Sequence, residues 1–300
     1  MTPLSVVFFG TPEFAVPSLE ALLAAGFEIP FVVTQPDRAA GRHAQVRPSA
    51  VGAWAAERGL PVEKPGSVRA NPALFERLEA ARPDAIAVVA YGRILPREIL
   101  DLPRLSCVNV HASLLPRHRG ASPVQAAILA GDRETGVATM KMEAELDAGP
   151  LYLERRVTIG DEETAGELSA RLARLGGRLL VETLEGLQEG RLDSRPQEGE
   201  PSYCRPIRRE DAEADWTQNA EELSRRLHAY TPWPGLHTHL GGERVKILDA
   251  RPAPARMPLA PGTFEFDGEE LVASAGDGTA LRIRKLQRAG RKPVTGAEFA

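Results

Sequence analysis

The first half of the chain alternates continuous apolar runs with segments of helical spacing. The apolar runs lie at residues 4–10, 29–34, 84–91 and 105–111. Segments with helical spacing lie at 14–26, 49–59 and 72–83, and a short strand is expected at 60–65. Uninterrupted apolar runs are typical of strands buried on both faces, and parallel strands need helical connections between them. The pattern therefore predicts an α/β fold with a doubly wound, mostly parallel sheet.

The pattern changes in the second half of the chain. A strand and turn at 151–164 and a long helix at 165–190 are expected to complete the first domain. The stretch 191–207 is rich in Pro, Gly and charged residues, which is typical of a linker. After a short helix, brief strands alternate with Gly-Gly, Asp-Gly and Gly-Asp-Gly turns, and this spacing predicts a small antiparallel β-barrel. We expect an α/β domain at 1–190 and a barrel domain at 208–300.

Composition places the chain among ordinary globular proteins. Of its 300 residues, 43% are hydrophobic and 26% are charged, and the net charge is −4. No uncharged apolar run approaches the ~20 residues that a membrane-spanning helix needs, and the first apolar run lacks the basic residues that precede a signal peptide core. Cys107 and Cys204 provide neither a disulfide framework nor a metal-binding pair. We expect a cytoplasmic protein that does not enter a membrane.

Basic residues are concentrated in the last third of the chain. The run "RIRKLQRAGRK" at 282–292 holds six Lys or Arg residues and no acid, and "RPIRR" at 205–209 adds three arginines. Acidic residues elsewhere offset these clusters. Taken alone, such runs are typical of a solvated face and do not identify a polyanionic partner.

Several common kinds of site are absent from the sequence. The first apolar run ends in "GTPEFAVP", whose bulky residues prevent the close approach to a pyrophosphate that NAD binding requires. The chain contains neither a P-loop nor a GxSxG sequence. His237 and His239 form a His-x-His pair without an evident third ligand, so we expect no metal site.

Asn109 and His111 lie at the carboxyl end of an expected central strand, where alternation puts both side chains on one face. Such a polar pair is costly to bury unless it is hydrogen-bonded or functional, and a hydrogen-bonded structural pair is the simpler alternative. Asp147 follows another expected strand and could either join them or cap a turn. Together the three could catalyse acyl transfer without a covalent intermediate. The imidazole would relay protons, the carboxylate would fix its tautomer, and the amide would stabilise an oxyanion.

Several segments along nearly the whole chain resemble the methionyl-tRNA formyltransferase family. They are "FFGTPEFAVPSLEAL", "VVTQPDRAAGR", "VVAYGRILP", "NVHASLLPRHRGASPVQAAILAGDRETGVATMKM", "LDAGP", "YTPWPG" and "LQRAGRK". The Asn-x-His-x-Ser-Leu-Leu-Pro run with a downstream Asp is typical of the wider group of formyltetrahydrofolate-using enzymes. "PWPG" and "EADW" (213–216) are typical of the branch that acts on tRNA.

The resemblance implies roles for particular residues. Asn109, His111 and Asp147 match the family's catalytic residues, and residues 88–95 match part of its pterin pocket. The matching folate-binding run consists of Ser113, Leu114, Leu115 and Pro116. The family has a Rossmann-like catalytic domain followed by an OB-like barrel, and barrels of this kind often bind nucleic acid.

The resemblance also implies contacts with tRNA. Arg42 matches an arginine in the family's insertion that contacts the acceptor end, although "HAQV" follows it where the family is richer in lysine. Pro206 stands where the family commonly has a linker lysine, and neighbouring arginines could supply that charge. The basic residues that we expect to contact tRNA are Arg42, Arg205, Arg208, Lys285, Arg288 and Lys292.

The implied function is transfer of a formyl group from 10-formyltetrahydrofolate to the α-amino group of methionyl-initiator-tRNA, for translation initiation. No metal is implied, and we expect a monomer. One alternative is a formyltransferase of the same fold that acts on a nucleotide-linked amino sugar or a purine precursor. A more distant alternative is a folate- or RNA-binding protein without catalytic activity.

Overall fold

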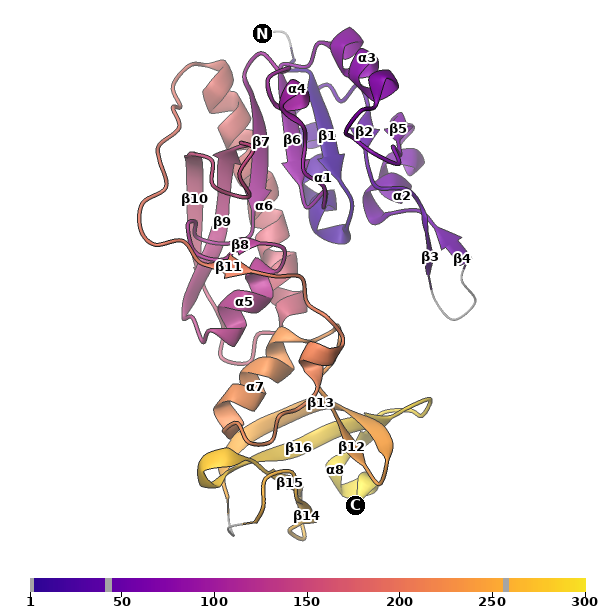
Figure 1. Ribbon diagram of the computed structural model, residues 1–300, viewed down its shortest axis with the longest axis vertical. Coiled ribbons are helices and arrows are strands. Elements are labelled where there is room, and N and C mark those ends of the chain that lie inside the picture. The colour runs from indigo at the N-terminus through magenta and orange to yellow at the C-terminus, as the bar shows by residue number, and fades with distance from the viewer. Residues whose placement is uncertain (1–2, 41–44, 256–258) are drawn as a thin grey trace. The chain divides into compact units, whose positions relative to one another are not determined.

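The structure is a computed structural model that describes residues 3–40, 45–255 and 259–300. The chain forms two compact units (Figure 1). The first unit contains Met1–Pro123, Glu134–Val157 and Ser169–Cys204, and the second contains Val124–Arg133, Thr158–Leu168 and Arg205–Ala300. No helix among the described residues combines the length and the apolar character needed to cross a bilayer.

The first unit is built on a seven-stranded sheet with the order β10-β9-β7-β6-β1-β2-β5. Neighbouring strands from β7 to β5 run parallel, and β9 pairs with β7 in the antiparallel direction. The strands are β1 (Val6–Gly10), β2 (Val32–Val33), β5 (Val62–Glu63), β6 (Ala85–Val89), β7 (Ser106–His111), β9 (Glu134–Lys141) and β10 (Leu151–Thr158). The order and directions confirm the predicted mostly parallel sheet.

Helices cover both faces of this sheet. Successive strand residues point to opposite sides, so neighbouring residues of one strand pack against different helices. Phe8 packs with residues of α1, α2 and α6 in one buried cluster, whereas its neighbour Phe9 packs with residues of α3 and α4 in another. The fold is therefore doubly wound, as predicted. The helices that precede the C-terminal unit are α1 (Val16–Ala24), α2 (Ala50–Glu57), α3 (Pro72–Ala81), α4 (Arg97–Leu100), α5 (Pro123–Leu129) and α6 (Ala165–Gln188).

Two short ladders lie outside the main sheet. The antiparallel pair β3 (Arg38–Ala40) and β4 (Gln45–Arg47) forms one of them. In the other, β8 (Arg119–Gly120) pairs in parallel with β11 (Tyr203–Cys204). The second ladder joins a loop that follows β7 to a segment more than 80 residues later in the chain.

The second unit is a curled antiparallel sheet with the order β12-β13-β16-β15-β14, in which β17 also pairs with β16. Register shifts in the long strand β13 accompany this curl, as β-bulges do. Leu223 and Leu227 of α7 join the buried core of the sheet. This half-barrel confirms the predicted OB-like architecture. Its elements are α7 (Ala220–Ala229), β12 (His237–Leu240), β13 (Glu243–Pro254), β14 (Phe264–Phe266), β15 (Leu271–Ser274), β16 (Thr279–Arg288), β17 (Val294–Thr295) and α8 (Gly296–Phe299).

Candidate active site

Asn109 and His111 lie at the end of β7, between β6 and β9. Asn109 pairs with Val88 on β6 and Met140 on β9, and both polar residues are less than a tenth exposed. Since β1, β6 and β7 are parallel, their carboxyl ends meet at one edge of the sheet, which is where ligands of doubly wound folds bind. The two side chains stand two residues apart and so share one face of the strand.

The His111 ring has a different partner on each nitrogen. Nε2 lies 3.0 Å from the carbonyl oxygen of His118. A carbonyl only accepts, so we assign the hydrogen of the neutral ring to Nε2. Nδ1 lies 3.7 Å from Oδ2 of Asp147, which is longer than a direct hydrogen bond. The His118 carbonyl was not expected from the sequence, and it selects the tautomer that leaves Nδ1 with a free lone pair.

The Asp147 carboxylate is fixed by the backbone of a different loop. The Gly120 amide donates to Oδ2 at 2.8 Å. Asp147 itself has φ +50°, and His118 and Ala90, which follow β7 and β6, also have positive φ. Non-glycine residues in this region are strained, and such strain is common at functional sites. The turn therefore holds the carboxylate beside the ring instead of merely reversing the chain.

The Asn109 side chain makes no hydrogen bond with any residue that the structure describes. Its amide is also not among the fully enclosed polar groups that lack a partner. A nearly buried amide that keeps access to solvent can donate to a bound molecule without first breaking an internal bond.

The predicted folate-binding run, residues 113–116, forms the loop directly after β7. Ser113 is fully buried, and its hydroxyl donates to the Arg117 carbonyl at 2.6 Å. Leu114 packs against Gly136 of β9, where an added Cβ would lie 2.5 Å from it. Leu115 is also buried. The loop therefore lies beside the candidate catalytic residues, and its contact with folate remains a prediction.

Several residues of 195–204, here called the closing segment, contact the loops that carry His118 and Asp147. Ser202 accepts a hydrogen bond from the His118 amide at 2.9 Å and donates its own amide to the Pro116 carbonyl at 3.2 Å. The Cys204 carbonyl accepts from the Ala121 amide at 3.1 Å, and burial raises the pKa of the Cys204 thiol. Gln197 contacts both the Asp147 loop and β8. These contacts could not be predicted from the sequence, because the polar composition of the segment is typical of a linker.

Replacing Gly120 with alanine is expected to lower the free energy of unfolding by about 2–4 kcal/mol. Gly120 has φ +118°, and an added Cβ would lie 2.2 Å from the Cys204 carbonyl oxygen, so the β8–β11 ladder must separate. Chemical denaturation measures the change. Gly190→Ala is the matched control, because Gly190 also has positive φ but nothing lies within 4 Å of its added Cβ. Equal losses of unfolding free energy in the two variants would show that the β8–β11 ladder accommodates the methyl group without separating.

The residues expected to contact tRNA are only partly described. Arg42 lies outside the described residues. Arg205 forms a two-point ion pair with Asp211, with contacts of 2.7 and 2.5 Å, and this pairing holds the pKa of Asp211 down to about 2. Arg208 is exposed and donates its backbone amide to the same carboxylate. Arg205 is therefore already engaged within the chain, whereas Arg208 presents its side chain to solvent.

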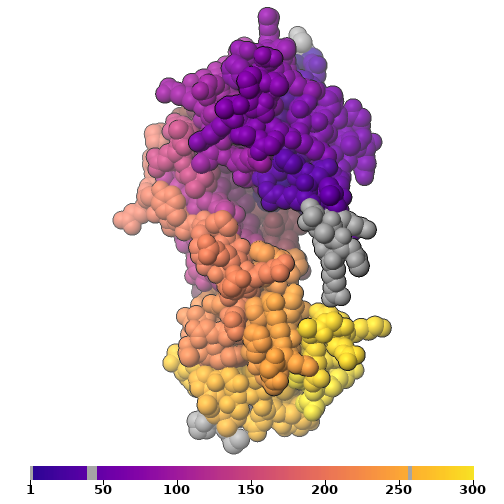
Figure 2. Space-filling view, turned by 45° about the vertical axis from the view of Figure 1, so that its right-hand side comes forward, coloured from indigo at the N-terminus to yellow at the C-terminus, as the bar shows by residue number. Residues whose placement is uncertain are grey.

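Internal ion pairs engage two of the six basic residues in the run 282–292. Arg282 is paired with Glu270 at 2.9 Å and Arg284 with Asp249 at 2.8 Å. Within the described parts of the chain, Lys285 and Lys292 are exposed and have no ion pair. Residues of this C-terminal region form the yellow surface in Figure 2. The two lysines are thus better placed than the two paired arginines to meet phosphates.

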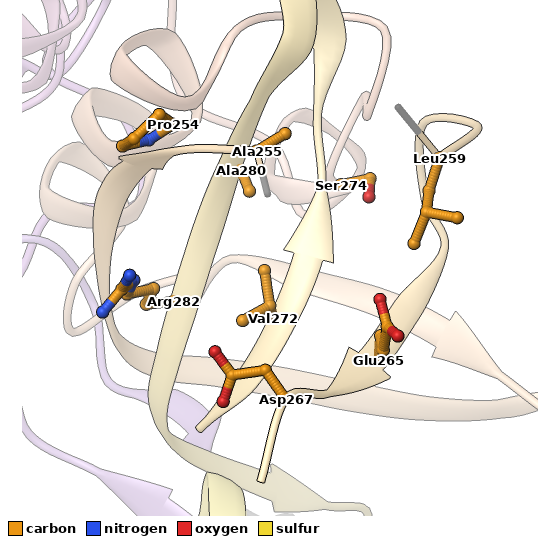
Figure 3. Close-up of a pocket in the computed structure, with 9 residues that line it drawn as sticks. All are labelled: Pro254, Ala255, Leu259, Glu265, Asp267, Val272, Ser274, Ala280 and Arg282. Carbon is orange, nitrogen blue, oxygen red and sulfur yellow. The ribbon is translucent and has the colours of Figure 1, made fainter. Parts of the chain in front are cut away.

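A shallow pocket in the same unit has the wrong charge for a phosphate. Its charged lining residues are Glu265, Asp267 and Arg282 (Figure 3). The positive charge of Arg282 is already paired with Glu270. Two carboxylates beside one paired guanidinium repel a polyanion, so we do not place tRNA in this pocket. Across the described residues, no group of three or more His, Cys, Asp or Glu side chains is arranged to hold a metal ion.

Comparison with known proteins gives matches over both units. Residues 4–184 match the family model described as formyl transferase, and residues 206–300 match the one described as formyl transferase, C-terminal domain. The chain is 46% identical over 297 residues to the methionyl-tRNA formyltransferase of Methylococcus capsulatus, a match that covers 99% of this chain and 96% of that protein.

Solved structures with the same fold are more distant in sequence. The methionyl-tRNA formyltransferase from Clostridium thermocellum matches 93% of this chain and 99% of its own, with a TM-score of 0.58 and 15% identity. HypX from Aquifex aeolicus in complex with tetrahydrofolic acid matches all of this chain and 47% of its own, with a TM-score of 0.66 and 18% identity. At these identities the similarity shows the fold alone.

Proposed function

The chain belongs to the methionyl-tRNA formyltransferase family, and on that premise we propose that Asn109, His111 and Asp147 are its catalytic residues. The enzyme transfers a formyl group to the α-amino group of methionyl-initiator-tRNA. The observation that carries the assignment is the arrangement around His111. A buried ring is held at Nε2 by a carbonyl, and its Nδ1 faces a fixed carboxylate. On the same strand face stands an amide that has no partner among the residues that the structure describes.

The nucleophile of this reaction is the α-amine of the methionyl group, and it needs positioning more than activation. A free α-amine has a pKa near ~7.7–8.0, and the ester of an aminoacyl-tRNA withdraws electrons and lowers it further. The attacking nitrogen is therefore largely neutral at physiological pH. It forms the new C–N bond directly with the formyl carbon, and no protein nucleophile is required.

Proton transfer follows from the geometry of His111. Nδ1 has a free lone pair and takes the proton that the amine nitrogen must lose. Asp147, 3.7 Å away, then stabilises the positive ring, while Nε2 keeps its bond to the His118 carbonyl. As the bond between the formyl carbon and the folate nitrogen N10 breaks, the same proton passes to N10, and His111 is regenerated neutral.

Asn109 stabilises the charge that develops on the formyl oxygen. Its amide hydrogens are available because the side chain has no internal partner among the described residues. A donor fixed on a strand needs no reorganisation when the oxyanion forms, which makes its contribution larger than in water. We therefore assign the oxyanion interaction to Asn109 rather than to His111, whose Nε2 is engaged with a backbone carbonyl.

The co-substrate that we propose is 10-formyltetrahydrofolate, which supplies the formyl group at N10. The residues present are consistent with it. The loop 113–116 follows directly from β7, and the stretch 88–95 follows β6 with Ala90 in a left-handed conformation. Both lie beyond the carboxyl ends of parallel strands, where a flat polar ring can be bound by backbone groups. No step of this mechanism needs a metal ion.

Formyl transfer to charged initiator tRNA tests the function directly. Purified enzyme with radiolabelled 10-formyltetrahydrofolate is given methionyl-initiator-tRNA, methionyl-elongator-tRNA or a nucleotide-linked amino sugar. We expect label on the initiator tRNA and little on the other two. Label on the amino sugar alone would instead support a sugar formyltransferase.

We place the tRNA contacts on the exposed basic residues of the second unit. Neutralising Lys285, Arg288 and Lys292 together is expected to raise KM for tRNA and to leave KM for folate unchanged. The logarithm of the tRNA binding constant should fall linearly with the logarithm of the salt concentration. Each lost phosphate contact should make this slope shallower by up to ~0.9, the value for duplex DNA. Filter binding across a salt series measures the slope.

The double variant Arg282→Gln and Arg284→Gln is the control for this prediction. It removes two positive charges from the same strand, but both belong to arginines already paired with Glu270 and Asp249. We expect its salt slope to stay close to that of the parent enzyme. If the triple and double variants behave alike, the run contributes only general charge, and Arg208 and Arg42 become the remaining candidates. The cytoplasmic location and the monomeric state stay predictions.

A further inference from the structure

Gln197, in the closing segment, uses its whole hydrogen-bonding capacity on two catalytic loops. Its Nε2 donates to the carbonyl oxygens of Asp147 and Gly149, both at 2.8 Å. Its Oε1 accepts from Nε and Nη2 of Arg119, at 3.2 and 2.7 Å. A primary amide has two N–H donors and one oxygen with two lone pairs, so no capacity remains for water or substrate.

The two loops that Gln197 joins are the two that set the position of the Asp147 carboxylate. One loop carries Asp147, whose left-handed turn is bound through the donors of Gln197. The other is β8, which consists of Arg119 and Gly120, and the Gly120 amide holds Oδ2 of Asp147. One side chain therefore ties both ends of the contact that aims the carboxylate at His111.

Arg119 makes this connection rigid. It is 8% exposed, and its contact with an acid, Glu145, is 4.0 Å long, with the Glu145 side chain 73% exposed. A nearly buried guanidinium needs close acceptors, and Oε1 of Gln197 supplies one for two of its N–H groups. The Tyr203 hydroxyl accepts from Nη1 of Arg119 at 3.3 Å, and the centroid of its ring lies 5.9 Å from the guanidinium carbon.

We propose that Gln197 is a positioning residue for formyl transfer, which acts by holding the Asp147 carboxylate at its distance from His111 Nδ1. The inference rests on the catalytic role proposed for Asp147. It gives one residue of the closing segment, and not the segment as a whole, a part in placing the carboxylate. A displacement of about 1 Å in such a centre can cost 10²-fold in rate. In metal sites, which offer a comparable case, loss of a residue that orients a ligand typically costs about 10- to 100-fold.

Two substitutions separate the two halves of the Gln197 contact. Gln197→Glu keeps the length and the acceptor for Arg119 but sets an oxygen against the carbonyls of Asp147 and Gly149. Gln197→Met keeps the approximate length and removes both halves. We expect both variants to lose about 10- to 100-fold in kcat, with KM for 10-formyltetrahydrofolate nearly unchanged, because neither touches the loop 113–116. If only the Arg119 contact mattered, Gln197→Glu would keep its rate, which would overturn the proposal.

Arg195→Gln is the matched control on the same segment. Arg195 donates to Glu154 on β10 at 3.1 Å, away from the catalytic loops. Removing this ion pair loosens the segment without touching Asp147 or β8, and we expect kcat to stay at the parent value. A loss in Arg195→Gln equal to that in Gln197→Glu would show that attachment of the segment in general is what matters, and the specific role of Gln197 would be wrong.

A double-mutant cycle distinguishes positioning from a purely structural role. If Gln197 acts through the Asp147 carboxylate, Gln197→Glu should cause little further loss of kcat in the Asp147→Asn background. A structural defect would multiply with the loss in Asp147→Asn, and that result would overturn the inference. The failure of the underlying function is also distinguishable: normal kcat in Asp147→Asn would remove the catalytic role of Asp147 and the role of Gln197 with it. The melting temperature of each variant, compared with that of the parent enzyme, shows whether the variant is folded under the assay conditions.

Discussion

Replacing His111 with alanine is expected to lower kcat for formyl transfer by about 10²–10⁴-fold, the range typical of a positioned acid–base group. In the proposed mechanism His111 Nδ1 accepts the proton of the attacking amine, and without it the tetrahedral intermediate must lose that proton to water. KM for the folate should change little, because the loop that follows β7 keeps its own hydrogen bonds. Single-turnover assays with saturating charged tRNA measure the chemical step.

His237→Ala is the matched control for this prediction. His237 is as buried as His111, at 6% exposure, and it also contacts a backbone carbonyl, that of Gly235. It lies on β12 of the second unit, so both variants lose a buried ring but only His111→Ala loses the proposed proton acceptor. Similar melting temperatures with a loss of kcat in His111→Ala alone would support the assignment. Normal turnover in folded His111→Ala would exclude His111 as the proton carrier.

The long regular elements could be predicted because a local pattern decides them. The apolar run 84–91 contains β6, and the helical segment 165–190 contains α6 almost from end to end. The run 29–34 gave a much shorter strand, β2, because only Val32 and Val33 pair with strands on either side. Strand length therefore depends on neighbours that the local pattern does not contain.

The alternation of side chains also placed Asn109 and His111 correctly at the end of β7, but it could not identify their partners. The His118 carbonyl that holds Nε2 belongs to the backbone, and every residue has such a group. Its position depends on the left-handed conformation of His118 and on the hydrogen bond from its amide to Ser202. Ser202 lies 84 residues further along the chain. Contacts of this kind follow from tertiary structure alone.

The closing segment shows the same limit. Its Pro, Gly and charged residues are typical of a linker, and the predicted linker 191–207 stays a prediction as a domain boundary. In the structure the two-residue strand β11 pairs with β8, and Gln197 and Ser202 bond to the loops that carry Asp147 and His118. Two-residue strands have no hydrophobic periodicity to detect. By contrast, the pairing of Arg205 with Asp211 joins residues only six positions apart, and their opposite charges could have indicated it.

Replacing Asn109 with aspartate is expected to lower kcat by about 10²–10³-fold, the typical cost of removing one oxyanion donor. The substitution keeps the shape of the side chain but exchanges its N–H donors for a carboxylate, which repels the developing negative charge. A protonated carboxylic acid can donate a hydrogen bond again, so the ratio of parent to variant rates should become smaller as the pH falls. Rates for both enzymes across a pH series measure this ratio.

Asn219→Asp is the control for the added negative charge. It makes the same substitution at a residue outside the site, so it separates the effect of the charge from the loss of the hydrogen-bond donor. Asn219 is the N-cap of α7, where its side-chain oxygen accepts from the Glu222 amide at 2.9 Å. Asparagine and aspartate are equally good N-caps, so neither stability nor kcat should change. Because the Asn109 side chain has no partner among the described residues, its replacement removes no internal hydrogen bond. A loss of rate in a variant that keeps the parent melting temperature therefore comes from the reaction itself. A folded Asn109→Asp enzyme with the parent kcat at neutral pH would show that the oxyanion is stabilised by another group, and the carbonyl-bound Nε2 of His111 would then have to exchange its partner during the reaction.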